Sequence, residues 1–275
     1  GDGNLNLVFI VKSSAGSAII KQALPYVRLV GDSWPLPLYR AFFEYHALTR
    51  QAARAKGSVP QVYYFDNNQA LIIMEYLEPH KILREKLILG ETVDHLADTL
   101  GKFCARTAFR GSDLSLDTAK VKSDRALFSG NVAIPAITEG LVFCDPYFNA
   151  EMNSNTPGLE KIVEVLRSDI EMKSRVQHFF RIYSAQQDKM CHGDLHSGSI
   201  MCTSWESKVI DPEFATYGPF GFDLGMLFAN YFMAFFSQPE HRSDNLEGYQ
   251  SWILEVIVDT WEMFVEEFSQ LWNTE

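Results

Sequence analysis

The chain has 275 residues, 47% of them hydrophobic and 21% charged, which is the composition of a globular protein large enough for two lobes. Its net charge of −11 and the lack of a basic stripe argue against a nucleic-acid partner, and its longest apolar run, residues 226–236, is too short to cross a membrane. The four cysteines form no Cys-x-x-Cys pair, so we expect reduced thiols in a cytoplasmic protein rather than a zinc site or disulfides.

The N-terminal segment predicts a nucleotide-binding hairpin. A polar loop over residues 1–6 contains two glycines and runs into an apolar strand over 7–11, and a turn over 13–16 leads to a second strand over 17–22. In kinases such a loop brings backbone N–H groups close to nucleotide phosphates, because only glycine permits this approach. Lys21 is a lone cation in the second strand, where kinases carry the lysine that contacts the phosphates. A water-facing edge lysine is the alternative.

A loop and a helix are predicted after this hairpin. Three prolines and a glycine over residues 24–37 predict an ordered loop, which contains Trp34, and apolar residues at helical spacing predict a helix over 38–56. Glu44 lies in the body of this helix. It either pairs with Lys21, as the corresponding glutamate does in kinases, or faces solvent, as most surface carboxylates do, and the sequence leaves both interpretations open.

A second hairpin completes the N-terminal part. Its strands are predicted over 61–65 and 70–75, across the polar turn 66–68. The segment Glu75-Tyr76-Leu77 follows, at the place where kinases have the hinge whose backbone hydrogen-bonds adenine. Exposed backbone therefore matters more in this segment than the side chains do.

The middle of the chain is predicted to be helical. Helices are expected over 91–108 and, as one long helix, over 159–183, with a proline-broken connector over 131–147 between them. The long helix delivers the chain to a strand that opens residues 190–213, which contain the candidate catalytic groups.

Residues 190–213 predict two carboxylates at neighbouring strand ends. The pattern indicates a strand, a sharp polar loop, and a hairpin of short strands over 199–203 and 208–211. Asp194 and Asp211 therefore stand at strand exits where apolar flanks shelter them. In protein kinases the first such carboxylate orients the attacking hydroxyl and accepts its proton, while the second holds magnesium on the ATP phosphates.

The predicted metal site departs from the usual kinase pattern at one position. Kinases carry an asparagine five residues after the catalytic aspartate, whereas this chain has Ser199, a weaker ligand. The triplet Asp211-Pro212-Glu213 supplies a second oxygen donor instead, and Mg²⁺ prefers oxygen ligands. We therefore predict that Asp211 and Glu213 hold the metal. The alternative is that these strand-end carboxylates only cap loops.

Structural roles are predicted for two further residues and for the last helix. His192 braces the catalytic loop through hydrogen bonds, because no third zinc ligand of suitable spacing follows His196. Asp223 caps a buried helix and hydrogen-bonds the catalytic loop rather than a metal. A helix over 246–272 carries an apolar stripe opposite acidic residues, and this stripe is either core of the larger lobe or covered by residues beyond this chain or by a partner subunit.

The loop His192-Gly193-Asp194-Leu195-His196 resembles the catalytic loop of the aminoglycoside phosphotransferase and choline kinase group. Further motifs resemble one family of that group, the S-methyl-5-thioribose kinases. The resemblance implies an α+β, bilobal protein-kinase-like fold, with a small antiparallel-sheet N-terminal lobe over 1–77 that binds ATP and a larger, mostly helical C-terminal lobe over 78–275. The motifs that carry the resemblance lie over residues 1–9, 21–28, 31–35, 138–147, 192–200, 211–214 and 217–223.

The resemblance also implies an activity. It is the transfer of the ATP γ-phosphate to the 1-hydroxyl of 5-methylthioribose, a step of methionine salvage, by a Mg²⁺-dependent homodimer. Asp194 would meet the sugar and activate its hydroxyl, and Trp34 would lie in a loop that closes near the substrate. The implied ATP-binding residues are Gly3, Asn6, Lys21, Glu75, Tyr76, Leu77, Asp211, Pro212 and Glu213, of which Asp211 and Glu213 hold magnesium.

Two features depart from this family. Its members carry adjacent arginines near the C-terminus that contact the substrate, and no Arg-Arg dipeptide occurs in this sequence. The family's chains also begin before Gly1 and continue past Glu275, so we expect a fragment whose activity is in question, because the arginines position the sugar. The alternatives are a non-catalytic nucleotide-binding remnant and a kinase of another small alcohol such as an aminoglycoside or choline, which the Asp-Pro-Glu triplet disfavours.

Overall fold

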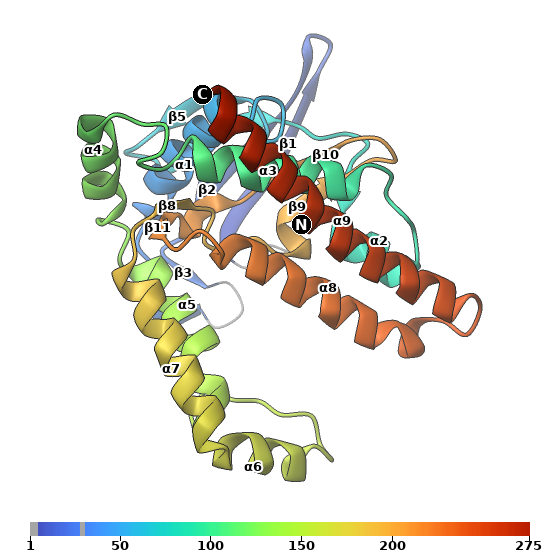
Figure 1. Cartoon of the computed structure of the whole chain (residues 1–275). Helices are drawn as coiled ribbons and strands as arrows, with labels where there is room; N and C mark the ends of the chain where they lie inside the picture. Colours follow the sequence, from blue (N-terminus) through green and yellow to red (C-terminus); the bar gives the residue numbers. More distant parts are fainter. Residues whose placement is uncertain (1–4, 28–30) are drawn as a thin grey trace.

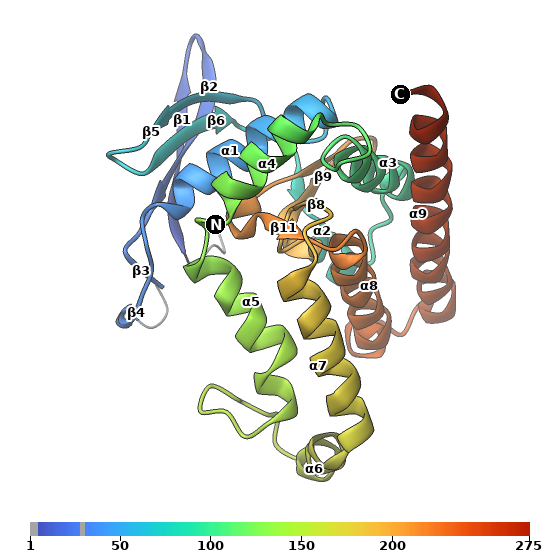
Figure 2. The ribbon, with the colours of Figure 1, turned by 60° about the vertical axis from the view of Figure 1, so that its left-hand side comes forward.

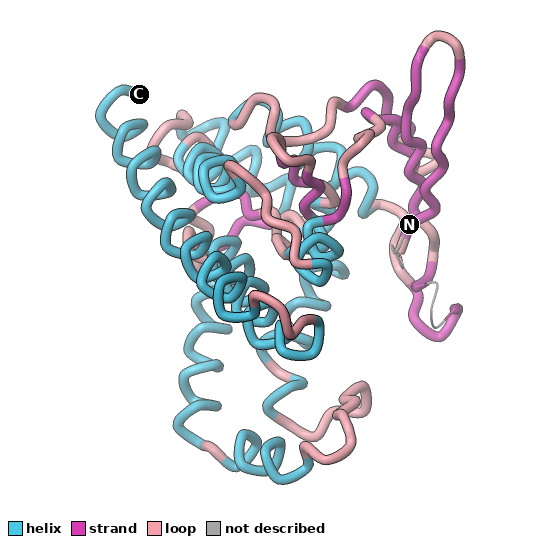
Figure 3. The backbone as a smooth tube through the Cα atoms, turned by 90° about the vertical axis from the view of Figure 1, so that its right-hand side faces the viewer, coloured by secondary structure: helices cyan, strands magenta, loops and turns pink. Residues whose placement is uncertain are grey.

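The structure is a computed structural model that describes residues 5–27 and 31–275. Antiparallel strands dominate the N-terminal part and helices the remainder (Figure 1). The predicted α+β fold, with a small sheet-containing part and a larger helical part, is therefore confirmed. Figure 3 shows the separation, with the long hairpin at one end of the molecule and the helices gathered beside and below it.

A four-stranded antiparallel sheet in the order β1-β2-β6-β5 forms the N-terminal part. Both predicted hairpins are confirmed, and Val8 lies opposite Lys21 while Ile10 lies opposite Ile19. Because alternate residues of a strand share a face, these four side chains lie on one side of the sheet. The strands are β1 (Asn6–Ser13), β2 (Gly16–Ala23), β5 (Val62–Asp66) and β6 (Leu71–Glu75).

Residues 24–37 contain a short hairpin where only a loop was predicted. β3 (Tyr26–Val27) pairs with β4 (Gly31–Pro35), and the N–H of Leu36 donates to the carbonyl of Pro25 at 2.9 Å. The proline at the end of β4 is compatible with this pairing, because proline is tolerated at the edge of a sheet.

Helix α1 (Arg40–Arg54) confirms the helix predicted over 38–56 and connects the two parts of the molecule. It runs beside the sheet (Figure 2) and also contacts the short turn η3 (Pro212–Phe214). Its buried face carries the apolar Phe43 and Leu48, together with the charged Arg40 and Glu44. Buried charges on a packed helix require partners, and these partners belong to the candidate site.

The helical part is built around the packing of α3 against α9. Gly101 of α3 makes close approach possible, because a Cβ at this position would lie 2.8 Å from the Thr260 carbonyl. The predicted helix over 91–108 begins later, after His95 in a left-handed conformation, and α2 was not predicted. The helices are α2 (Leu83–Leu89), α3 (Leu96–Phe109), α4 (Thr118–Phe128), α8 (Phe222–His241) and α9 (Leu246–Thr274).

The stripe of α9 is only partly buried. Ile253 lies in the main core, as predicted, while Trp261 is 51% exposed and Trp272 is 60% exposed. The core interpretation of the stripe therefore fails at these two tryptophans, since α3 and α8 cover only part of the helix, and the alternative, cover by a partner subunit or by residues beyond this chain, stays a prediction.

Two predictions for residues 131–183 were wrong. The connector contains α5 (Ala133–Phe143), whose Pro135 lies in the first turn, where the missing N–H has no intrahelical acceptor to lose. The long helix is two helices, α6 (Glu160–Ser168) and α7 (Ile170–Ala185). Between them Asp169 caps the second helix by accepting from Met172 N at 2.9 Å, and this starts a new helix. Ile170, the first residue of α7, is 81% exposed.

Short strand pairs frame the stretch over 190–213. β8 (Lys189–Cys191) pairs with β11 (Thr216–Gly218), and β9 (Ile200–Cys202) pairs with β10 (Ser207–Val209), which confirms the predicted strand and hairpin. β7 (Lys81–Ile82) adds to β9. Helix α7 leads directly into β8, as predicted.

The structure also describes the state of the cysteines and the length of the apolar helices. All four cysteines lie within the described residues and are free thiols. In the described ranges no single helix has both the length and the apolarity to cross a bilayer, although α4 together with residues 133–147, bent by 79°, satisfies the same criteria as a pair.

Candidate active site

His192 braces the loop between β8 and β9. Its side chain is buried, with Nε2 at 2.9 Å from the carbonyl of Ile210, and Nδ1 accepts from the N–H of Asp194 at 3.2 Å. Since Nδ1 accepts, Nε2 carries the proton and donates to Ile210. Burial lowers the pKa of His192. The predicted bracing role is confirmed.

Asp223 holds the same loop from the first turn of α8. Its carboxylate accepts from the N–H groups of His192 at 3.0 Å and Gly193 at 3.1 Å, and pairs with the buried Lys189. Burial opposes its ionisation, but the charge of Lys189 and the N–H donors of the loop outweigh burial and hold the pKa of Asp223 below its ordinary value. The predicted bond to the catalytic loop is confirmed, whereas Gly221 rather than Asp223 occupies the cap position of α8.

The turn before Asp194 requires glycine. Gly193 has a φ of +87°, and a Cβ there would lie 2.2 Å from the carbonyl oxygen of Phe214. The hydroxyl of Ser199 donates to the carbonyl of Asp194 at 3.0 Å and closes the loop. Ser199, which replaces the usual asparagine, therefore stabilises the backbone that presents Asp194. The Asp194 side chain is 30% exposed, so its carboxylate reaches solvent.

A buried ion cluster joins the sheet, α1 and the end of β10. Lys21 Nζ lies 2.7 Å from Glu44 Oε1 and 2.5 Å from Asp211 Oδ1. The side chains of Lys21 and Glu44 are only 6% and 2% exposed, while that of Asp211 is 46% exposed. The Lys21–Glu44 pair, one of two interpretations of the sequence, is therefore confirmed. A lysine in this position presents positive charge beside an accessible carboxylate.

Protonation in this cluster follows from burial and charge. Burial disfavours the charged form of Lys21, but Asp211, Glu44 and Glu213 together raise its pKa above the ordinary value. Burial raises the pKa of Glu44, against the opposing effect of Lys21. Burial also opposes ionisation of Asp211, yet Lys21 outweighs it and lowers the pKa of that carboxyl.

Glu213 is held by a second buried cation that sequence reasoning missed. Arg40 is fully buried, and its Nε donates to Glu213 Oε2 at 3.1 Å. Asn6 Nδ2 lies 3.3 Å from Glu213 Oε1 and so joins β1 to the same carboxylate. The remaining N–H groups of Arg40 bond to Asn6 Oδ1 and to the carbonyls of Leu5, Leu24 and Pro37. No local pattern signals this arginine, because all these partners but Pro37 are more than ten residues away in sequence.

Asp211 and Glu213 supply carboxylate oxygens, the ligand type that Mg²⁺ prefers. Asp211 is half exposed and has a positive φ of 63°, which aspartate tolerates better than most residues. Both oxygens of Glu213 accept hydrogen bonds, yet each carboxylate oxygen has a second lone pair. In the described part of the chain no group of three His, Cys, Asp or Glu residues can hold a metal, so phosphates and water would complete the shell.

The predicted hinge joins β6 to β7. Glu75 donates its N–H to the Gln61 carbonyl at 2.8 Å, and its carboxylate pairs with Lys208 at 3.2 Å. Lys12 lies 5.0 Å above the ring of Tyr76. The N–H of Glu75 and the carbonyl of Tyr76, which accepts from the N–H of Glu78 at 3.1 Å, are bonded within the protein, so other backbone groups of residues 75–77 would have to recognise a base.

Of the predicted site residues, Lys21 and Asp211 meet in the ion cluster and Asn6 and Glu213 meet beside Arg40. No described contact joins either group to Asp194, Glu75, Tyr76, Leu77 or Trp34. Gly3 lies outside the described residues. Trp34 lies on β4, is partly exposed, and forms no described hydrogen bond or aromatic contact.

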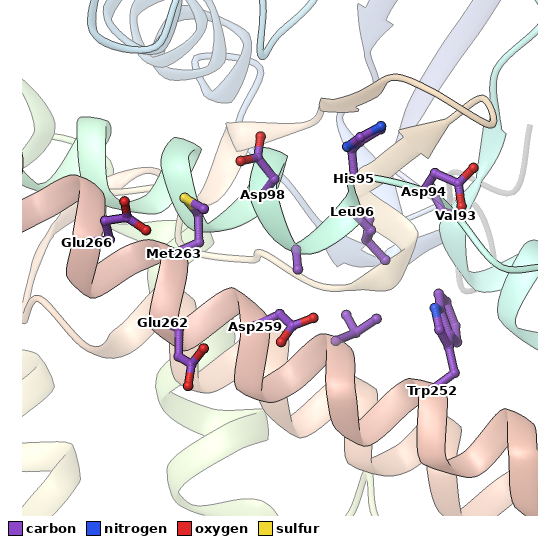
Figure 4. Close-up of a pocket in the computed structure, with 12 residues that line it drawn as sticks. Val93, Asp94, His95, Leu96, Asp98, Trp252, Asp259, Glu262, Met263 and Glu266 are labelled. Atoms are coloured by element: carbon purple, nitrogen blue, oxygen red, sulfur yellow. The ribbon is translucent and has the colours of Figure 1, made fainter.

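A cavity of about 620 Å³ lies between the start of α3 and α9, away from this cluster (Figure 4). It contains none of the predicted site residues. Five of its twelve lining residues are acidic, among them Asp98, Asp259, Glu262 and Glu266, and Trp252 lies at one end.

Comparisons with known proteins point to phosphotransferases. The profile of the phosphotransferase enzyme family (APH) matches residues 1–257. A methylthioribose kinase of Escherichia coli O45:K1 is 44% identical over 277 residues, which cover 99% of this chain and 66% of that relative. A methylthioribose kinase of Geobacillus sp. strain WCH70 is 42% identical over 100% of this chain and 67% of its own length. The chain thus spans about two thirds of the curated relatives it matches.

The fold has a solved counterpart. The structure of a glucosamine kinase in complex with glucosamine, ADP and inorganic phosphate gives a TM-score of 0.58 at 15% identity, and the match covers 97% of this chain and 68% of that chain. At this identity the likeness concerns the fold alone.

Proposed function

We propose that this chain transfers the γ-phosphate of ATP to the 1-hydroxyl of 5-methylthioribose. The reason is that the chain belongs to the phosphotransferase enzyme family and, within it, to the methylthioribose kinases. The product is 5-methylthioribose 1-phosphate, an intermediate of methionine salvage. One observation carries the proposal beyond the resemblance. The Lys21–Glu44–Asp211 cluster unites a strand lysine, a helix glutamate and a strand-end aspartate, the three groups that protein kinases use for phosphoryl transfer from ATP.

The ATP site is assigned to the N-terminal lobe, residues 1–77, facing the C-terminal lobe, residues 78–275. Val8, Ile10 and Ile19 share the Lys21 face of the sheet and offer an apolar surface for adenine. The backbone of residues 75–77 offers hydrogen bonds to the base. Lys21, which two carboxylates hold, would neutralise the α and β phosphates.

Magnesium would be held by Asp211, with Glu213 as the second carboxylate and Pro212 fixing the turn between them. Held there, Mg²⁺ would supply positive charge that neutralises the negative charge developing on the transferred phosphoryl group. The contacts of Glu213 with Asn6 and Arg40 set the position of its carboxylate relative to Asp211. Asn6 therefore contributes to the nucleotide site through Glu213.

Asp194 is the proposed base. Its carboxylate accepts the proton of the sugar 1-hydroxyl as the oxygen–phosphorus bond forms, and the bond between the γ-phosphorus and the β,γ-bridging oxygen breaks to release ADP. Partial exposure of Asp194 suits this role, because an acceptor must reach it from solvent.

Further features are proposed on family membership alone. They are a homodimer, a cytoplasmic location, a phosphate-facing role for Gly3, and a loop carrying Trp34 that closes near the sugar. Each of these stays a prediction.

An acceptor panel tests the proposed function. The purified chain is incubated with ATP, Mg²⁺ and one of methylthioribose, glucosamine, choline or kanamycin, and ADP release and phosphorylated product are measured. We expect product with methylthioribose and little with the others. A preference for another acceptor would refute the substrate, and ATP binding without any product would leave the nucleotide-binding alternative.

A further inference from the structure

His196 contacts the proposed base but has no role in the function proposed above. Its Nε2 lies 3.2 Å from Oδ2 of Asp194, and the two side chains are 25% and 30% exposed. A partly exposed aspartate carboxylate can rotate about its terminal torsion unless a neighbouring group fixes it. This contact is therefore placed where it can set the orientation of Asp194.

The surroundings of His196 fix which ring nitrogen carries the proton. Gly198 donates its N–H to Nδ1 at 2.8 Å, and Arg84 Nη2 lies 3.0 Å from the same nitrogen. Both groups are donors, so Nδ1 must offer its lone pair. The ring proton then lies on Nε2, the nitrogen that lies 3.2 Å from Oδ2 of Asp194. The bond from Gly198 alone caps the turn η2 (Ser197–Ser199), but such capping leaves the contact between Nε2 and Asp194 unexplained.

Gly198 and Arg84 pack closely against the His196 ring. A Cβ at Gly198 would lie 2.6 Å from Cε1 of His196 and 2.9 Å from Nη2 of Arg84, so a larger residue would displace the ring. Arg84 stands in the first turn of α2 and also reaches Ser197 Oγ at 3.4 Å through Nε. Arg84 therefore holds the catalytic loop from a different element of the chain.

We propose that His196 is a positioning residue: its Nε2–H donates to Oδ2 of Asp194 and leaves Oδ1 for the acceptor hydroxyl, while Arg84 and Gly198 fix its tautomer. The inference rests on the proposed function in one respect, because that function identifies the sugar 1-hydroxyl as the group that donates its proton to Oδ1. Misorientation of a reacting group costs about 10- to 100-fold in rate. Loss of the histidine is therefore expected to lower kcat without weakening ATP binding, because the ring contacts no group of the Lys21–Glu44–Asp211 cluster within hydrogen-bond distance in the described residues.

Kinetics of three variants test the role. H196L removes the donor, H196Q retains an amide N–H near the position of Nε2, and H178L removes an exposed histidine of α7 as a matched control. We expect H196L to lose about 10- to 100-fold in kcat with an unchanged KM for ATP, H196Q to recover most of that loss, and H178L to match the wild type. Equal losses in H196L and H196Q, or none in H196L, would overturn the proposal.

Histidine NMR separates this inference from the proposed function. In protein labelled with ¹⁵N-histidine at about pH 8, the His196 signal, assigned by its loss in H196Q, is expected to show the Nε2–H tautomer, and R84M is expected to shift it toward the other tautomer. An Nδ1–H tautomer or a doubly protonated ring in the wild type would refute the inference. If the wild type forms no sugar phosphate, the proposed function fails while this spectrum still decides the role of His196.

Discussion

Replacement of Lys21 by methionine tests the buried ion cluster. The substitution keeps the length and apolar stem of the side chain but removes the charge that lies 2.7 Å from Glu44 and 2.5 Å from Asp211. Glu44 is 2% exposed and cannot recruit water in place of the lysine. Removing one partner of a buried pair costs about 3–5 kcal/mol, because the other charge is left without compensation.

A double variant shows whether this cost arises from the stranded carboxylate. In K21M/E44Q no charge remains at the helix position, so the loss of stability is expected to be smaller than in K21M, with a coupling between the two sites of about 1–3 kcal/mol. K12M is the matched control, because Lys12 pairs with Glu78 at a similar distance of 2.9 Å while both side chains are more than half exposed. Its unfolding midpoint should stay close to that of the wild type.

Urea unfolding followed by fluorescence gives the free energies, and nucleotide titration gives the ATP affinity. K21M is expected to lose both stability and ATP affinity, and K21M/E44Q to regain stability only. The reasoning would be refuted if K21M unfolded at the wild-type midpoint, or if K21M/E44Q were destabilised by the sum of the losses measured for K21M and for E44Q alone.

Three further predictions follow from the loop and helix geometry. G193A forces a left-handed conformation on a residue with a Cβ and should cost at least about 1–3 kcal/mol in urea unfolding together with most of kcat; a wild-type midpoint would contradict this. D169A removes the cap of α7 and should cost about 1 kcal/mol, whereas D169N should cost less. Because burial lowers the pKa of His192, the unfolded state binds its proton first, so stability is fully present above about pH 6.5 and declines as the pH falls below it. Unfolding curves at several pH values should show a shallower decline in H192Q, and an equal decline would refute this assignment.

Features set by local pattern were predictable from the sequence. The hairpins of β1–β2 and β5–β6, the helix α1, the β9–β10 hairpin and α9 all follow strand alternation or helical spacing, and the structure contains them. The same holds for His192, because its bracing bonds stay within the catalytic stretch. A segment with the right period and the right turn residues specifies its own conformation.

Long-range partners were not predictable in the same way. Whether Glu44 meets Lys21 or solvent depends on how α1 packs on the sheet, and Arg40 reaches Glu213 across 173 residues of sequence. Arg84 reaches the catalytic loop across more than 100 residues. The break at Asp169 had a signal, because an aspartate that precedes an apolar-periodic run is a common helix cap, but the apolar residues on both sides favoured one continuous helix.

Phosphorylation of methylthioribose by the D194N variant tests the central claim most directly. The wild type and D194N are each incubated with ATP, Mg²⁺ and methylthioribose, phosphate esters at C1 are followed by ³¹P NMR, and ATP affinity is measured on the same preparations. The account predicts a C1 phosphate ester from the wild type and none from D194N at equal ATP affinity. An active D194N, or a phosphate ester at another hydroxyl, would contradict it.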